Sequence, residues 1–184
     1  MPGKIESNRL NNVKTALKVI GLIGLLGAAI AMPNILVAAD KLFDIRGRKK
    51  FQKNLHQLKR SKYIEIGEID GVATVRITEK GKDRVLRVVA EDFKVSVPKK
   101  WDGKWRMVAF DIPEKKRNAR NVLRGMLRRV GFFQLQKSLM IFPYDCEKEI
   151  LGMCDIFGIT DHVFFMTAGQ FAGDAKFKKM FILS

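Results

Sequence analysis

The stretch Trp101-Asp102-Gly103-Lys104-Trp105 leads into an apolar run, residues 107–110, which ends in the carboxylate of Asp111. Pro113 and Glu114 then open a long, very basic pattern with helical spacing. A buried strand that carries an acidic group at its end, next to a cationic helix, suits a protein that handles phosphates. The same stretch marks the place where a second domain begins.

The composition favours a folded, basic protein. The chain has 184 residues, of which 47% are hydrophobic, and its formal net charge is +16. The apolar content is ample for one large or two small cores. The positive charge favours an anionic partner, nucleic acid first and acidic lipid second. Cys146 and Cys154 match neither a metal-ligand spacing nor a disulfide framework, so we expect a cytoplasmic protein.

The apolar stretch over residues 19–39 has two interpretations. It contains no charged residue and is long enough to span a bilayer, which predicts a membrane-anchored protein. Pro33-Asn34 interrupts it at a place where one helix would end and the next begin, which predicts buried helices of a soluble domain instead. Residues 1–12 are polar and are expected to form a flexible tail.

Residues 13–95 are predicted to form a domain of helices followed by a hairpin. Asp70-Gly71 lies between two segments that alternate with period two, which is a strong hairpin signal. Thr78 is placed to cap a helix over residues 79–90. The other expected elements are helices over 13–32, 33–43 and 49–61 and strands over 63–69 and 72–78.

Three helices followed by a two-stranded hairpin is the element order of a winged helix-turn-helix domain, although a generic small α+β domain with a solvated basic face would look similar. In a winged helix the third helix enters the major groove of double-stranded DNA, and the hairpin touches the flanking backbone. The candidate nucleic-acid-binding residues are Arg46, Arg48, Lys49, Lys50, Lys53 and Arg60, with Arg76 on the wing.

After a linker over residues 96–103, residues 104–184 are predicted to form a ferredoxin-like domain with the order βαββαβ. The expected strands cover 104–111, 132–137, 138–143 and 162–168, and the expected helices cover 113–130 and 145–157. The basic, apolar tail over 176–183 is expected to pack on the sheet or on a partner. The first helix carries a cationic stripe that either binds nucleic acid or is solvated: Lys116, Arg117, Arg120, Arg124 and Arg128. Trp101 and Trp105 are expected to pack the two domains together.

Three pieces of the chain resemble the PaaX-type repressors of phenylacetate degradation. They are Trp101-Asp102-Gly103-Lys104-Trp105, the segment Gly131-Phe132 with Leu135-Gln136-Lys137-Ser138-Leu139-Met140, and residues 55–64 with Ile77-Thr78-Glu79-Lys80-Gly81. The resemblance implies a DNA-binding transcriptional regulator, with residues 55–81 as recognition helix, wing and post-wing helix.

The second half also resembles the ferredoxin-fold endonuclease subunit of CRISPR adaptation, through Phe110-Asp111, the basic helix and Gln136-Lys137-Ser138. Such subunits pair as homodimers, and strand-end aspartates from two copies can hold a divalent metal. This resemblance implies Asp111 as a metal ligand and catalytic residue of an Mg²⁺-dependent endonuclease. The residues also allow a simpler role, since Asp111 and Glu114 have the spacing of a capping box.

The sequence therefore predicts an α+β protein, with an N-terminal winged helix that binds DNA and a C-terminal ferredoxin-like domain that forms a homodimer. Transcriptional regulation is the leading function; no cofactor is assigned to it, and Mg²⁺ is the candidate cofactor of the nuclease alternative. A metal-dependent nuclease acting through Asp111 and a membrane-tethered nucleic-acid binder are the alternatives.

Overall fold

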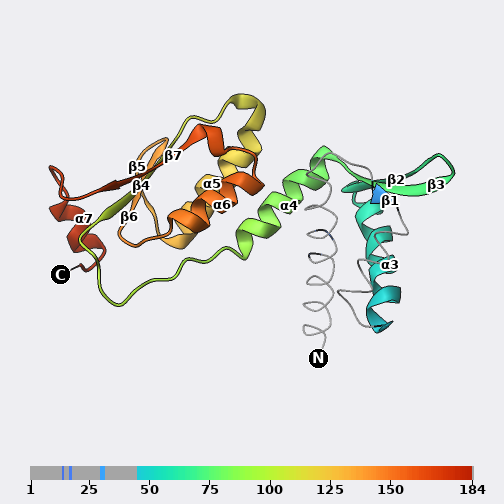
Figure 1. Cartoon of the computed structure of the whole chain (residues 1–184), viewed down its shortest axis with the longest axis horizontal. Coiled ribbons are helices and arrows are strands. Elements are labelled where there is room, and N and C mark those ends of the chain that lie inside the picture. Colours follow the sequence, from blue (N-terminus) through green and yellow to red (C-terminus); the bar gives the residue numbers. More distant parts are fainter. Residues whose placement is uncertain (1–13, 15–16, 18–29, 32–44, 184) are drawn as a thin grey trace. The chain divides into compact units, whose positions relative to one another are not determined.

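The computed structural model describes residues 14, 17, 30–31 and 45–183 of the chain. The chain divides into two compact units, residues 1–89 and residues 90–184. Each unit has its own antiparallel sheet with helices beside it (Figure 1). The predicted mixture of helices and strands is therefore confirmed, with two separate sheets.

The first sheet has three strands in the order β1-β3-β2, and neighbouring strands are antiparallel. The elements concerned are β1 (Ile30–Ala31), α3 (Ile45–Arg60), β2 (Ile64–Ile69), β3 (Val72–Ile77) and α4 (Glu79–Glu91). The core between this sheet and the helices is apolar because each element turns one periodic face inward. Its buried members are Leu17, Leu55, Leu58, Ile64, Val75, Ile77, Val85 and Val88.

The hairpin between β2 and β3 forms as its turn residues predict. Asp70 and Gly71 have φ values of 50° and 75°. A two-residue loop with both residues in the left-handed region matches the right-handed twist of the two strands, and Gly meets this requirement without steric cost. The register then places Glu65 opposite Arg76 and Ile69 opposite Val72.

α4 is held against the turn between α3 and β2. Thr78 caps the helix as predicted, because its Oγ1 accepts a hydrogen bond from the Gly81 amide at 3.0 Å. The same hydroxyl donates to the carbonyl of Lys62 at 2.7 Å. Gly81 lies so close to the turn that a Cβ atom there would be 2.0 Å from the carbonyl oxygen of Tyr63. Only glycine allows this approach.

Two predictions for the first unit are wrong at their boundaries. Ile30 and Ala31 pair with Val75 and Thr74 as a strand, so the helix predicted over 13–32 does not continue to Met32. The edge of β3 offers backbone partners that the helical pattern of the sequence does not reveal. α3 begins at Ile45, before the predicted start at Lys49, so Gly47 lies within the helix.

Most of the stretch over 19–39 lies outside the described residues, as does the predicted tail over 1–12. Among the helices of the described part, none is long and apolar enough to cross a membrane.

The second unit has the element order βαββαβ, as the sequence predicts. Its sheet order is β5-β6-β4-β7 with antiparallel neighbours, which is the strand order that a ferredoxin-like domain requires. The bounds are β4 (Trp105–Phe110), the 3₁₀ turn η1 (Glu114–Lys116), α5 (Arg117–Val130), β5 (Phe133–Gln136), β6 (Leu139–Phe142), α6 (Glu147–Ile156), the 3₁₀ turn η2 (Thr160–His162), β7 (Val163–Ala168) and α7 (Ala175–Met180).

The predicted capping box is wrong. The α-helix begins at Arg117 rather than 113, and no side chain makes a capping hydrogen bond to η1 or α5. Pro113 stands at the N-cap of η1, and Glu114 pairs with arginines of α5 instead of reaching back to Asp111. Gly131, in contrast, ends α5 in the left-handed conformation directly after residue 130, where the helix is predicted to end.

The C-terminal tail packs on the sheet of its own unit. Trp105 is fully buried on this face, together with Ile141 and Phe177 of α7. The rings of Trp101 and Trp105 are 5.0 Å apart, and Phe171, Phe177 and Phe181 surround Trp105. The two tryptophans therefore pack, as predicted, but against the tail of the second unit, and the expectation that they join two domains is replaced by this contact.

Candidate nucleic-acid interface

α3 separates an apolar face from a basic one. Asn54, Leu55 and Leu58 are buried, whereas Lys53 and Arg60 are exposed on the opposite side and Lys59 is exposed at the border of the buried face. Lys53 and Arg60 are seven residues apart, so they lie on one line along the helix. No hydrogen bond or ion pair within the described part of the chain holds the side chains of Lys53, Lys59 or Arg60. Lys59 was not among the residues predicted from the sequence to bind nucleic acid, although its side chain is exposed as those of Lys53 and Arg60 are.

The other predicted cations of α3 belong to its first turns. Arg46, Arg48, Lys49 and Lys50 lie within the helix, and their side chains are outside the described part. Their proposed contacts with nucleic acid remain predictions.

The hairpin is less suited to a phosphate backbone than the sequence pattern suggests. Arg76 is exposed as predicted, but Glu65 stands directly opposite it on β2. Glu68 and Asp70 add two further carboxylates, and Arg76 is the single cation of residues 64–77. Because like charges repel, three carboxylates against one guanidinium weaken the attraction of this hairpin for DNA phosphates.

The cationic stripe of α5 is tied into its own unit. Arg120 donates to the carbonyl of Ile112 at 3.2 Å and to Glu114 at 2.9 Å. Arg124 donates to the carbonyl of Lys137 at 3.1 Å, and its guanidinium lies 5.7 Å from the centre of the Phe110 ring. The remaining members also have protein partners: Lys116 with the Gly158 carbonyl, Arg117 with Glu114, and Arg128 with Gln134. These side chains therefore connect α5 to the loops around the sheet.

Asp111 stands exposed at the end of β4, and its amide donates to the carbonyl of His162 at 2.9 Å. The described residues contain no group of three or more His, Cys, Asp or Glu side chains that would hold a metal ion. Within one copy, the surroundings of Asp111 therefore do not supply the oxygen ligands that Mg²⁺ requires. Its catalytic and metal-binding roles remain predictions.

The Trp-Asp-Gly-Lys-Trp signature forms a hydrogen-bonded turn at the start of β4. The guanidinium nitrogens Nη1 and Nη2 of the buried Arg106 both donate to the Asp102 carboxylate, at 2.7 and 2.6 Å. Asp102 also accepts from the Lys104 amide at 3.0 Å, and Trp101 donates to the Lys104 carbonyl. The hydrogen bonds from Arg106 lower the pKa of Asp102 to about 2. Gly103, with a φ of 76°, makes the turn that this arrangement needs.

The two cysteines are unreactive in this fold. Cys146 and Cys154 are both buried, and burial raises the pKa of Cys146 to about 12 and that of Cys154 to about 11. Their thiols stay protonated at neutral pH, so the two side chains act as small apolar groups packed in the core around α6.

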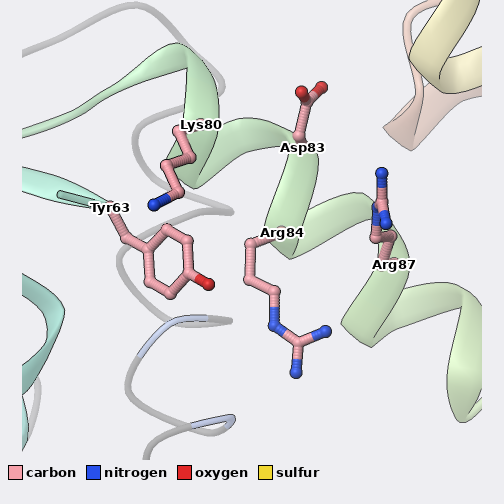
Figure 2. Close-up of a pocket in the computed structure, with 5 residues that line it drawn as sticks. All are labelled: Tyr63, Lys80, Asp83, Arg84 and Arg87. Atoms are coloured by element: carbon pink, nitrogen blue, oxygen red, sulfur yellow. The ribbon is translucent and has the colours of Figure 1, made fainter. Parts of the chain in front are cut away.

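A basic pocket lies beside α4 in the first unit. Tyr63 forms one wall, and Lys80, Asp83, Arg84 and Arg87 of α4 form the other (Figure 2). The sequence analysis missed it, although the spacing of the three cations by four and three residues places them on one helical face. The missing information was the position of Tyr63, which only the tertiary packing of α4 against the preceding turn supplies.

Comparison with known families bears on the second unit. Residues 98–179 match the family model of the PaaX protein central Cas2-like domain. This stretch of the chain is similar to PaaX. The match begins just before the Trp-Asp-Gly-Lys-Trp signature and ends within α7, so the hydrogen-bonded turn around Arg106 and the aromatic cluster up to Phe177 belong to the PaaX-like region. No curated protein matches the chain.

Proposed function

We propose that this protein is a transcriptional regulator that binds double-stranded DNA through its first unit. The observation that carries the proposal is the arrangement of that unit. α3 is followed directly by the hairpin of β2 and β3, and β1 adds to β3 at the far edge. This order supports a winged helix with α3 as its recognition helix. The PaaX-like second unit supports a regulator rather than a general nucleic-acid binder.

The proposed contact surface is the exposed basic face of α3. Lys53, Lys59 and Arg60 would bind phosphates or base edges, and helical spacing would let Lys49 and Lys50 extend the same surface. The acidic hairpin would contribute little to affinity, so this regulator would depend on its helix more than on its wing. Arg76 would then serve mainly to offset Glu65 across the hairpin.

We further propose that the second unit forms the homodimer, so that two copies of α3 read two half-sites of a palindrome. A symmetric dimer places the same surface of each copy on one operator. Sedimentation of the full chain at micromolar concentration would give the mass of two chains, and the mass of one chain would contradict this part of the proposal.

The test is salt-titrated binding of the full chain to a pool of random duplexes, followed by sequencing of the retained fraction. A selected palindrome would support both specific reading and the dimer. In a double variant, Lys53→Gln with Arg60→Gln, the slope of log affinity against log salt should fall by about 0.9 for each lost phosphate contact.

The matched control removes two exposed cations of the second unit, Lys137→Gln with Lys148→Gln. Its net charge equals that of the α3 variant, but its salt slope should stay near that of the unaltered chain. Equal slopes for the two double variants would mean that α3 is not the contact surface. A pool without any enriched sequence would contradict a sequence-specific regulator.

A further inference from the structure

The pocket beside α4 is not used by the proposed DNA contact. It is an open hollow of about 390 Å³, which lies in the size range of small-molecule sites. Its described lining is unusual for such a site because three of these five residues are cations: Lys80, Arg84 and Arg87. Asp83 is the single carboxylate among the described lining residues, which together carry about two net positive charges.

The side chains are arranged around the ring of Tyr63. The Lys80 ammonium lies 5.3 Å from the centre of this ring and donates to the carbonyl of Ser61 at 3.1 Å. In Figure 2 the Lys80 ammonium reaches toward the Tyr63 ring, the Arg84 side chain starts beside the Tyr63 hydroxyl and extends away from it, and the Asp83 carboxylate points away from the ring. The pocket therefore combines an aromatic surface with one cation over the ring and further cations along α4.

The framework of the pocket is fixed. The close approach of Gly81 to the Tyr63 carbonyl and the two hydrogen bonds of Thr78 hold α4 against the turn that carries Tyr63. A ligand would therefore meet its cations and its ring at a set separation, which lowers the entropy cost of binding.

We infer that this pocket binds a small phosphate-bearing ligand. Lys and Arg donors at several points around a compact polyanion are the arrangement that recognises phosphate oxygens. The Tyr63 ring provides a flat apolar surface for a planar group attached to the phosphate. This binding site goes beyond the proposed DNA contact and does not depend on it.

The chain offers an internal reference for the test. It has two tyrosines, Tyr63 in the pocket and Tyr144 in the second unit. In the full chain with isotope-labelled tyrosine, titration with inorganic pyrophosphate or adenosine monophosphate should shift the ring signals of Tyr63 saturably, while Tyr144 stays unchanged. Tighter binding of adenosine monophosphate than of inorganic phosphate would assign a role to the ring as well as to the cations.

Variants connect the shift to the proposed cations. Lys80→Gln with Arg84→Gln should weaken binding by about tenfold or more, because charge-assisted hydrogen bonds to phosphate are lost. Lys80 also holds the α3–β2 turn, so Arg87→Gln is the second variant. Its exposed side chain makes no contact that the described part of the fold requires, and it should weaken binding about threefold or more. The control, Lys137→Gln with Lys148→Gln, should bind as the unaltered chain does.

Three outcomes would overturn the inference. The first is a linear, unsaturable shift, and the second is an equal shift of Tyr63 and Tyr144, since either indicates only a general attraction of anions to a basic protein. The third is that duplex DNA shifts Tyr63 and needs Arg84 and Arg87, while pyrophosphate and adenosine monophosphate have no effect. The surface would then belong to the DNA contact.

Discussion

α3 and α5 are both basic helices, yet their cations differ in whether they have partners within the protein. Lys53, Lys59 and Arg60 of α3 extend from an exposed face without a protein partner in the described part of the chain. Arg120 and Arg124 of α5 donate to backbone carbonyls and to Glu114. The sequence patterns of the two helices are alike, so the difference comes from acceptors that the fold brings near one helix and not near the other.

Positive charge alone therefore does not identify a binding surface. A guanidinium that satisfies a carbonyl within its own unit would have to give up that bond to reach a phosphate. We therefore expect the α3 cations to affect DNA affinity and the α5 cations to affect stability.

The largest effect should come from a glycine that fixes the first unit. Gly81→Ala would place a Cβ atom 2.0 Å from the Tyr63 carbonyl oxygen, a backbone atom that no rotamer change can move aside. We expect a loss of about 3 kcal/mol or more in the free energy of unfolding of this unit. Denaturant unfolding followed by circular dichroism measures it.

The matched control is Gly125→Ala in α5, where an added Cβ atom meets nothing within 4 Å. This variant should be stabilised by about 0.5–1 kcal/mol, because alanine favours the helix over glycine. Similar effects of the two substitutions would show that α4 is not locked against the α3–β2 turn.

Arg106 is a buried cation whose guanidinium donates hydrogen bonds to Asp102, and this pair predicts that the stability of the fold depends on pH. Asp102→Asn should cost about 1–3 kcal/mol at pH 7, because the buried guanidinium loses a charged acceptor. Asp102 itself is 48% exposed, and solvent screening therefore favours the lower end of this range.

The pH dependence follows from the lowered pKa of Asp102, about 2 in the folded chain. A depressed carboxyl pKa stabilises the fold above the unfolded value of about 4, and this contribution is lost as the pH falls toward 2. The stability difference between the unaltered chain and Asp102→Asn should thus shrink over this window. A difference that stays constant from pH 5 to about pH 2 would contradict the ion pair.

Two double variants, one that removes cations from α5 and one that removes cations from α3, test the comparison directly. Arg120→Gln with Arg124→Gln should lower the free energy of unfolding by about 1–2 kcal/mol, since the hydrogen bonds to the carbonyls of residues 112 and 137 and to Glu114 are lost. Lys53→Gln with Arg60→Gln should change it by less than about 0.5 kcal/mol. Duplex affinity should show the reverse order. If the α5 variant lost more affinity than the α3 variant, the cationic stripe would be the DNA contact after all.

The smallest effect should come from Glu114→Gln. It removes the ion pairs with Arg117 and Arg120, in both of which the Glu114 carboxylate is exposed to solvent. The free energy of unfolding should fall by less than about 1 kcal/mol. Arg120 would keep its hydrogen bond to the Ile112 carbonyl. Thermal unfolding at low and high salt checks this, because the cost should vanish when salt screens the pairs.

Local signals in the sequence predicted much of the fold. The Asp70-Gly71 turn, the Thr78 cap, the end of α5 at Gly131 and the βαββαβ order all depend on neighbours within a few residues. Predictions that depend on distant partners failed or were incomplete. The strand at Ile30–Ala31 needs the edge of β3, and the capping box lost Glu114 to Arg117 and Arg120.

The candidate site followed the same division. Exposure of Lys53, Arg60 and Arg76 could be predicted from helical and strand periodicity. The contacts that hold Arg120 and Arg124 could not, because their acceptors are carbonyls of residues 112 and 137, and a carbonyl has no sequence signature. The pocket at Tyr63 could not be predicted because it depends on the packing of α4 against the turn before β2.

Both tryptophans of the chain, Trp101 and Trp105, belong to the aromatic cluster of the second unit. Fluorescence excited at wavelengths that spare tyrosine therefore reports on one half of the molecule alone. Unfolding of the first unit alone would leave this emission unchanged, whereas circular dichroism would record it. Two optical signals thus separate the unfolding of the two halves without any label.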